Sequence, residues 1–147
     1  MRKQAQMQEF FSDSELKTKE FAKKLAFHLV QGSFLAVYGE LGAGKTAFVQ
    51  GLAEGLGVRE SVVSPTYTIL RVYESGRLPL YHFDIYRVED EDELYETGFE
   101  EYAAGDGICV CEWADLIPEA LPAPRLDISI VRTGDAGRHI TVREVEK

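Results

Sequence analysis

Hydrophobic and polar residues follow a pattern that predicts a strand, a tight turn and a helix in the first third of the chain. The apolar, β-prone run at residues 33–38 is short and unbroken, as expected of a buried strand. After a turn rich in glycine, apolar residues recur at helical spacing from Ala47 to Leu56. Gly57 is well placed to end that helix.

A first helix is expected before this strand. Ser12 and Glu15 have the spacing of a capping box, which predicts Ser12 as the N-cap. Gly32 is expected to stop the helix. The apolar face of the helix is predicted to carry Leu16, Phe21, Leu25, Ala26 and Leu29.

The middle of the chain predicts an antiparallel strand pair and a helical segment. Residues 67–74 and 78–86 have strand character, and their connection at residues 75–77 is so short that it demands antiparallel pairing. The acidic stretch at residues 88–102 is expected to be helical, with an interruption at Gly98.

Strands return in the last third of the chain. Residues 107–111 form an apolar run typical of a buried strand, which ends at Glu112. Two alternating runs, at residues 126–131 and 139–142, are expected to form a terminal hairpin through the turn at residues 133–137.

The glycine-rich turn at residues 39–46 reads Gly-Glu-Leu-Gly-Ala-Gly-Lys-Thr, a complete G-x-x-x-x-G-K-[ST] phosphate-binding loop. Its glycines allow successive N–H groups to point at phosphate oxygens, and the following helix adds the partial positive charge of its N-terminus. Lys45 is expected to reach the β- and γ-phosphates, and the Thr46 hydroxyl to coordinate Mg²⁺. The predicted nucleotide-binding residues of the loop are Gly39, Glu40, Leu41, Gly42, Ala43, Gly44, Lys45 and Thr46.

Composition narrows the function classes. Lys and Arg number 16 against 25 Asp and Glu, and the resulting formal charge of −9 argues against broad nucleic-acid binding through a basic face. The sequence has no apolar run of signal-peptide or membrane-spanning length, so we expect a cytoplasmic protein without membrane contact. Cys109 and Cys111 are spaced poorly for a disulfide or a zinc site and are expected to be buried free thiols.

Hydrolysis of a nucleotide also requires a carboxylate, usually at the end of a buried strand, for the metal shell or the attacking water. Asp84 and Glu112 fit that description. An acidic residue inside a strand pattern costs free energy unless it is paired or binds a metal. An alternative stays open for each carboxylate. In the first, Glu112 lies just past its strand, solvated and without a role. In the second, Asp84 has a structural role in an ion pair with Arg87 or a hydrogen bond with His82.

The tetrapeptide Ser64, Pro65, Thr66 and Tyr67 follows the predicted helix, where loops that sense a γ-phosphate usually lie. Thr66 is a candidate for contact with Mg²⁺ or the γ-phosphate, although the same four residues equally suit a simple turn. The chain has no Asn-Lys-x-Asp motif for reading guanine, which favours an adenine nucleotide.

These elements predict an α/β fold, namely a P-loop NTPase-like three-layer domain with a mixed parallel and antiparallel sheet. A length of 147 residues suits one domain, so residues 1–147 are expected to form a single P-loop ATPase domain.

Five motifs taken together closely resemble the TsaE family, the small bacterial ATPases of tRNA threonylcarbamoyladenosine biosynthesis. They are residues 39–46, 64–67, 82–87 and 98–102 and the pair Glu112-Trp113. The resemblance extends from about residue 10 to the terminal hairpin. It implies an ATPase that acts with the TsaB and TsaD proteins to support threonylcarbamoyl transfer to a tRNA adenosine. Any contact of this chain with tRNA is expected to be indirect or secondary.

The resemblance also implies roles for particular residues, with ATP and Mg²⁺ as cofactors. Lys45, Asp84 and Glu112 would be catalytic, with Asp84 acting as a catalytic or a switch carboxylate, and Thr46 and Glu112 would be the Mg²⁺ ligands. Trp113 would lie near the nucleotide or at a contact that moves. Ser64, Pro65, Thr66 and Tyr67 would form a nucleotide-responsive switch loop. The chain has Ala114 at a position where proline is common in the family, a minor departure.

Two other functions remain as alternatives. A small-molecule P-loop kinase would need an acceptor pocket and an arginine-bearing lid, and no long insertion with arginines follows the predicted helix. A nucleotide-sensing adaptor would bind ATP without useful hydrolysis. For the ATPase we expect slow turnover by the chain alone, because no recognisable motif supplies an arginine finger, which Arg87 or a partner would have to provide.

Overall fold

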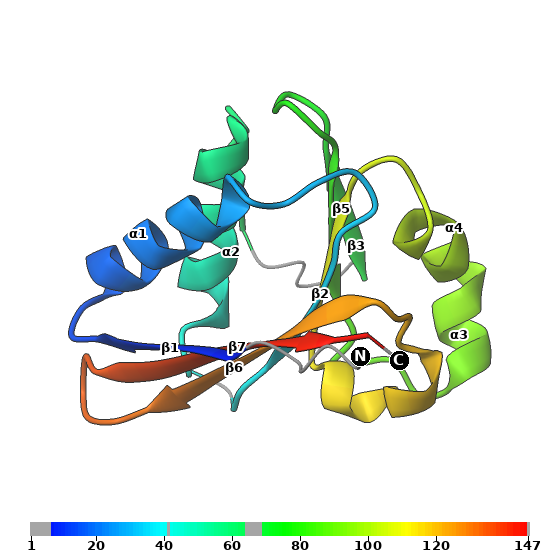
Figure 1. The fold of residues 1–147 in the computed structure, drawn as a ribbon. Coiled ribbons are helices and arrows are strands. Elements are labelled where there is room, and N and C mark those ends of the chain that lie inside the picture. Colours follow the sequence, from blue (N-terminus) through cyan, green and yellow to red (C-terminus); the bar gives the residue numbers. More distant parts are fainter. Residues whose placement is uncertain (1–6, 41, 64–68, 147) are drawn as a thin grey trace, which may run out of the picture.

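A mixed sheet of seven strands forms the centre of the computed structural model, which describes residues 7–40, 42–63 and 69–146 (Figure 1). The strands are ordered β1-β7-β6-β2-β5-β4-β3 across the sheet. Their bounds are Met7–Ser12 for β1, Phe34–Tyr38 for β2, Leu70–Tyr73 for β3, Leu80–Asp84 for β4, Ile108–Glu112 for β5, Arg125–Arg132 for β6 and Arg138–Val145 for β7. The predicted α/β fold with a mixed sheet is confirmed.

Parallel strands occupy the middle of the sheet, and antiparallel strands extend it on both sides. β2 pairs in parallel with both β5 and β6, and β4 pairs in parallel with β5. β3 joins β4 antiparallel on one side, whereas β7 and then β1 continue the sheet antiparallel from β6 on the other. The carboxyl ends of β2, β4 and β5 therefore meet at one edge, where ligand sites of α/β proteins commonly lie.

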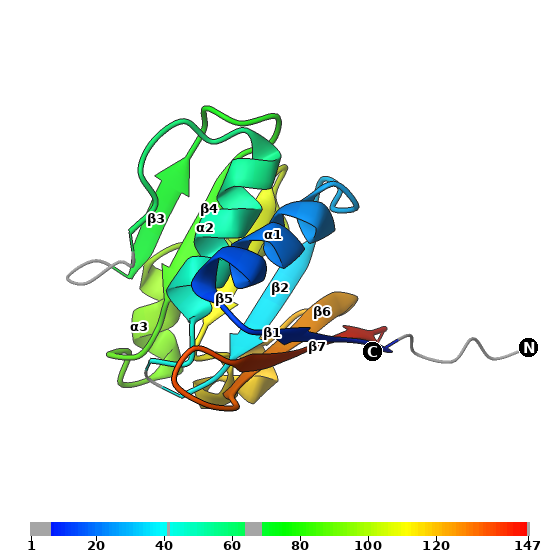
Figure 2. The same ribbon diagram turned by 90° about the vertical axis from the view of Figure 1, so that its left-hand side faces the viewer.

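Helices cover both faces of the sheet (Figures 1 and 2). The helices on one face are α1 (Glu15–Ala26) and α2 (Lys45–Leu56), and those on the other are α3 (Glu91–Glu96) and α4 (Phe99–Ala103). Two short 3-10 turns, η1 (Ala114–Leu116) and η2 (Pro118–Ala120), lead from β5 to β6. No helix within the three described ranges is long and apolar enough to cross a membrane.

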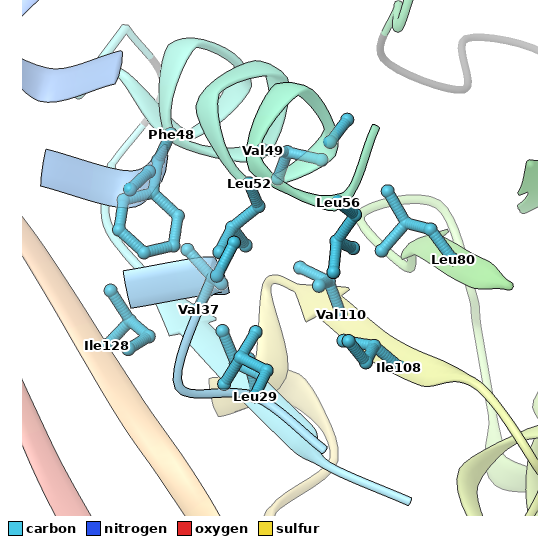
Figure 3. Close-up of a cluster of buried hydrophobic side chains, with 14 of the residues drawn as sticks. Leu29, Val37, Phe48, Val49, Leu52, Leu56, Leu80, Ile108, Val110 and Ile128 are labelled. Atoms are coloured by element: carbon cyan, nitrogen blue, oxygen red, sulfur yellow. The ribbon is translucent and has the colours of Figure 1, made fainter. Parts of the chain in front are cut away.

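The larger hydrophobic core lies between the sheet and the helices α1 and α2. Figure 3 shows Phe48, Leu52 and Leu56 of α2 directed toward the sheet, where Val37 and Val110 lie. All five side chains are buried. Burying a side chain of this size contributes on the order of 1.5–3 kcal/mol. This core therefore fixes α2, and with it the glycine-rich loop that precedes α2, on the sheet.

The second core lies between the sheet and the helices α3 and α4. Phe99 of α4 packs edge-on against Phe34 and Phe83 of the sheet. Cys109 and Cys111 are buried in the same core as free thiols, as predicted. Burial raises the pKa of both thiols, which keeps them protonated and unreactive. These cysteines therefore act as packing residues.

Most of the predicted elements and boundaries agree with the structure. α2 ends at Gly57, which adopts a left-handed conformation (φ +83°). The acidic stretch is divided into α3 and α4 at Gly98, which is also left-handed (φ +86°). β3 and β4 pair antiparallel, and β6 and β7 form the terminal hairpin. In each case the signal is local, a glycine or a short connection.

The start of the first helix differs from the prediction. Ser12 is not the N-cap: α1 begins at Glu15, and the Ser14 Oγ accepts a hydrogen bond from the Lys17 N–H (3.1 Å). Ser12 instead ends β1, an edge strand that the hydrophobic pattern did not predict. Its buried Oγ accepts a hydrogen bond from Thr18 Oγ1 (2.8 Å), which ties β1 to α1.

The apolar face of α1 was predicted in part, whereas the end of the helix was predicted wrongly. Phe21, Ala26 and Leu29 are buried and Leu25 packs against the core, as expected. Leu16 is 65% exposed, and α1 ends at Ala26 instead of continuing to Gly32. The buried residues of the helix are Thr18, Phe21, Ala22 and Ala26. Small residues face α2 because the two helices approach closely at Gly55, where an added Cβ would lie 2.7 Å from the Cβ of Ala26. A leucine on that face would not fit.

Candidate functional site

The loop between β2 and α2 has a backbone that depends on its glycines. Gly42 and Gly44 adopt left-handed conformations (φ +80° and +103°), which other residues rarely adopt. Gly39 lies so close to β6 that a Cβ there would be 2.8 Å from the carbonyl oxygen of Ile130. Gly44 is the N-cap of α2, and no side-chain hydrogen bond caps this helix in the described structure. The first N–H groups of α2 are therefore available to an anion.

A cavity of about 440 Å³ lies beside this loop at the carboxyl edge of the parallel strands. Four parts of the chain line it: the loop with the start of α2, the ends of β4 and β5, the start of α1, and the β6–β7 turn. The lining residues are Glu15, Thr18, Gly42, Gly44, Lys45, Thr46, Ala47, Asp84, Glu112, Trp113, Asp135, Ala136 and Arg138. The structure thus brings both candidate carboxylates and the motif residues Lys45 and Thr46 to one cavity.

Lys45 is directed back onto its own loop. The side chain is only 6% exposed, its Nζ donates a hydrogen bond to the Gly39 carbonyl oxygen, and the same atom lies 3.3 Å from the centre of the Trp113 ring. Burial lowers the pKa of Lys45, and the negative charges of Glu112 and Asp84 oppose that shift. The ammonium group is therefore held by a neutral carbonyl oxygen and an aromatic ring, in a cavity that two carboxylates also line.

Trp113 has an unusual backbone for its residue type. It is the one residue other than glycine with a positive φ in the described part of the chain (φ +62°). Such a conformation costs on the order of 1–3 kcal/mol and is found mostly where a function requires it. The indole ring contacts Lys45 and also packs at a tilt of 43° against the Tyr86 ring, with ring centres 4.7 Å apart. The sharp turn after β5 thus aims the indole at the cavity.

The two candidate carboxylates lie side by side. Asp84 and Glu112 are register partners at the carboxyl ends of the parallel strands β4 and β5. Glu112 is 2% exposed, so the alternative in which it lies solvated is wrong. Its Oε2 contacts His82 Nε2, so His82 pairs with Glu112 and not with Asp84 as one alternative had it. The Asp84 Oδ1 accepts a hydrogen bond from the Tyr86 N–H (3.1 Å).

These oxygen atoms suit a magnesium ion held together with phosphate. Like charges opposite each other on neighbouring strands repel, so Asp84 and Glu112 favour a cation between or above them. The Thr46 side chain lines the same cavity. No group of three or more His, Cys, Asp or Glu residues within the described ranges would enclose a metal by itself. Mg²⁺ is usually bound by one or two protein oxygens plus substrate phosphates, which agrees with this sparse set.

Comparison with known proteins relates this site to a family. The family model described as "Threonylcarbamoyl adenosine biosynthesis protein TsaE" matches residues 12–140. The chain belongs to the TsaE family. Among curated TsaE proteins, that of Bacillus subtilis (strain 168) is 52% identical over 128 residues, which cover 87% of this chain and 80% of the relative. The Treponema pallidum (strain Nichols) protein is 45% identical over 114 residues, 78% of this chain and 84% of the relative.

A solved structure agrees with this assignment. The crystal structure of Bacillus subtilis YdiB matches with a TM-score of 0.84 and 41% sequence identity, and the match covers 98% of this chain and 89% of that chain. The α/β architecture and the mixed seven-stranded sheet described above are therefore matched by a solved structure over almost the whole chain.

One functional candidate in this TsaE-family cavity was missed by the sequence prediction. Arg138, at the start of β7, donates hydrogen bonds to the carbonyl oxygens of Gly137 (2.7 Å), Asp135 (3.4 Å) and Gly42 (3.3 Å). Its Nε lies 3.2 Å from the position that a Cβ at Gly44 would take. No motif marks this arginine, because only the pairing of the terminal hairpin beside β2 carries it to the loop.

The remaining predicted site residues lie elsewhere. Gly39, Glu40 and Ala43 shape the loop but do not line the cavity. Ala43 is buried in the core beneath the loop, and Glu40 is exposed. Leu41 and the proposed switch loop Ser64, Pro65, Thr66 and Tyr67 lie outside the described residues.

Proposed function

We propose that this chain is a single-domain P-loop ATPase that acts in the cytoplasm in tRNA threonylcarbamoyladenosine biosynthesis. It would work with the TsaB and TsaD proteins to support threonylcarbamoyl transfer to a tRNA adenosine. Membership of the TsaE family supports the pathway. The observation that carries the ATPase proposal is the meeting of Lys45, Thr46, Asp84 and Glu112 in one cavity beside the uncapped start of α2.

Nucleotide binding is assigned to the loop and the start of α2. The backbone N–H groups from Gly42 to Thr46 would hold the phosphates, since the helix N-terminus favours negative charge. Lys45 would leave the Gly39 carbonyl oxygen and turn toward the β- and γ-phosphates, a small movement for a flexible four-carbon side chain. Trp113 would lie against the bound nucleotide or against the displaced lysine.

The two carboxylates receive different roles. Glu112 is deeply buried and one of its oxygens is occupied by His82, so we assign it, with Thr46, to holding Mg²⁺. When bound there, the ion would neutralise charge on the phosphates. Asp84 is less buried and lines the cavity, so we assign it to accepting a hydrogen bond from the attacking water and orienting that water toward the γ-phosphorus.

Turnover by the chain alone is expected to be slow. Arg87, one candidate for an arginine finger, is exposed and does not line the cavity. Arg138 lines the cavity but is engaged with three carbonyl oxygens. Stimulation by a partner would follow if the partner supplied an arginine or moved one into place. The segment of residues 64–67 would report the state of the γ-phosphate to that partner.

The deciding experiment measures ATP hydrolysis by this chain alone and with purified TsaB and TsaD. We expect weak basal hydrolysis, stimulation by the partners, and loss of both activities in Lys45→Ala. Lys23→Ala is the matched control, because this exposed lysine pairs with Glu54 away from the cavity and its loss should change neither rate. Tight ATP binding without stimulation would contradict the proposal and favour the adaptor. A phosphorylated metabolite product would favour the kinase.

A further inference from the structure

His82 is a buried polar residue that the proposed mechanism leaves unexplained. It lies in β4, two residues before Asp84, and its side chain is 0% exposed. Alternation along the strand places His82 on the same face as Leu80 and Asp84, the face covered by α2. A histidine in such a position costs free energy unless its nitrogens find partners.

The one polar partner of His82 recorded in the described ranges is the Glu112 carboxylate. The imidazole Nε2 contacts Glu112 Oε2, across the diagonal between β4 and β5. A carboxylate oxygen can only accept, so the proton of this contact lies on Nε2. Nδ1 is buried and meets no hydrogen-bonding group within the described structure. The ring is therefore a fixed donor directed at one oxygen of Glu112.

Holding Glu112 Oε2 in place also restricts the position of the second carboxylate oxygen, Oε1. A glutamate side chain has three rotatable bonds, and Lys45, which lines the same cavity as Glu112, is a competing partner for its carboxylate. By holding Oε2, His82 leaves Oε1 as the oxygen available for a ligand in the cavity that Glu112 lines. Partners that orient metal-ligating groups typically change metal affinity 10- to 100-fold when they are removed.

We propose that His82 is a positioning residue that orients Glu112 for the Mg²⁺ of bound nucleotide. The inference rests on the proposed function, since it concerns the same site. His82 does not touch the nucleotide or the metal and acts only through Glu112. The competing explanation is that His82 merely fills the core beside its register partner Val110.

Two amide variants separate these explanations. In His82→Gln the amide nitrogen reaches about as far as Nε2 and can still donate to Glu112. In His82→Asn the amide ends near the position of Nδ1 and falls short. Val110→Ala is the packing control, because it removes buried volume beside His82 without touching the carboxylate. Thermal unfolding establishes that each variant is folded, and His82→Leu replaces His82→Asn if that variant does not fold.

The readouts are the affinity for ATP with Mg²⁺ and with EDTA, measured by calorimetry, and Mn²⁺ binding to the ATP complex, measured by electron paramagnetic resonance. We expect His82→Asn to bind ATP normally in EDTA but to lose about 10-fold or more of the gain that Mg²⁺ provides. His82→Gln should retain most of that gain, and Val110→Ala all of it. Mn²⁺ affinity should fall in the same order.

The outcomes separate failure of the inference from failure of the proposed function. Equal metal responses in His82→Asn and His82→Gln would overturn the positioning role, as would a loss in Val110→Ala as large as that in His82→Asn. If the unchanged chain fails to bind ATP, or binds it without any effect of Mg²⁺, the proposed function itself is wrong.

Discussion

At the residue scale, opposing effects act on the charge of Lys45 in the cavity. Burial lowers the pKa of Lys45, whereas the negative charges of Glu112, Asp84 and Asp115 act in the opposite direction. Its hydrogen bond goes to a neutral acceptor, the Gly39 carbonyl oxygen. A phosphate would replace that acceptor with a full negative charge in a partly buried place, where the attraction is stronger than in water. The interaction of Lys45 would therefore become more favourable if a nucleotide phosphate bound.

Tyr81 leads to a prediction about stability at alkaline pH. Its hydroxyl donates to Asp106 Oδ1 (2.7 Å), and this hydrogen bond, together with burial, raises the pKa of Tyr81 to about 12. The phenol of an unfolded chain titrates near pH ~10, so above that pH the unfolded state loses a proton that the folded state keeps. The contribution of Tyr81 is therefore present below pH ~10 and is lost as the pH rises toward about 12.

The test is urea unfolding measured across this alkaline range. We expect Tyr81→Phe to lessen the fall in unfolding free energy with pH. Tyr73→Phe is the control, because the buried Tyr73 hydroxyl has no hydrogen-bond partner among the described residues. An unchanged slope in Tyr81→Phe would refute this account of the hydrogen bond to Asp106.

Residues that meet in the candidate cavity could be picked out from the sequence where their signal is local. Lys45 and Thr46 belong to a short motif, and Glu112 interrupts an apolar strand. The contact of His82 with Glu112 could not be predicted, because it depends on the register of β4 against β5. Hydrophobic periodicity identifies a strand but does not say which residues of its neighbour it meets.

At the scale of elements, the hydrophobic pattern predicted the buried helices and strands better than the exposed ones. β2, α2 and β5 are buried, and their apolar runs are bounded by glycine or charge. β1 is an edge strand with mostly exposed side chains, so no clear alternation marks it. Because β1 was not predicted, the Ser12–Glu15 spacing was interpreted as a capping box. In the structure Ser12 belongs to β1, which pairs with β7.

The packing of α1 on α2 predicts an unusual response to a glycine substitution. Alanine in place of a helical glycine normally stabilises a protein by about 1 kcal/mol. A Cβ at Gly51, however, would lie 2.9 Å from the Cβ of Ala22 and even closer to the backbone of Lys19. Backbone cannot turn aside as a flexible side chain can, so α1 would have to move. We expect Gly51→Ala to lower the unfolding free energy by about 2 kcal/mol.

Chemical denaturation measures this effect, with Gly134→Ala as the matched control. A Cβ at Gly134, in the β6–β7 turn, would meet nothing within 4 Å. That variant should keep the unfolding free energy within about 0.5 kcal/mol of the unchanged chain. A stabilised Gly51→Ala would mean that α1 and α2 do not approach as closely as the structure has them.

At the scale of the whole molecule, the order of the strands assembles the cavity from distant parts of the chain. β2 lies between β5 and β6, so the glycine-rich loop is flanked by the ends of β4 and β5 on one side and by the β6–β7 turn on the other. The sequence pattern predicted the mixed sheet and the terminal hairpin. It could not place that hairpin at the cavity, because strand order follows from long-range packing that periodicity does not encode.

The position of Arg138 beside the loop leads to a prediction about nucleotide affinity. Its guanidinium lies against the loop at Gly42 and Gly44. The carbonyl oxygens that hold it there are neutral, so from this fixed place its positive charge would attract a bound polyphosphate without reaching out as an arginine finger. We expect Arg138→Gln to weaken ATP binding about tenfold, the loss of one charge-assisted contact, and to reduce its dependence on ionic strength. The nearby Arg132 is exposed and does not line the cavity, so Arg132→Gln should change the affinity less. Equal affinities in calorimetry for both variants and the unchanged chain would limit Arg138 to clamping the hairpin.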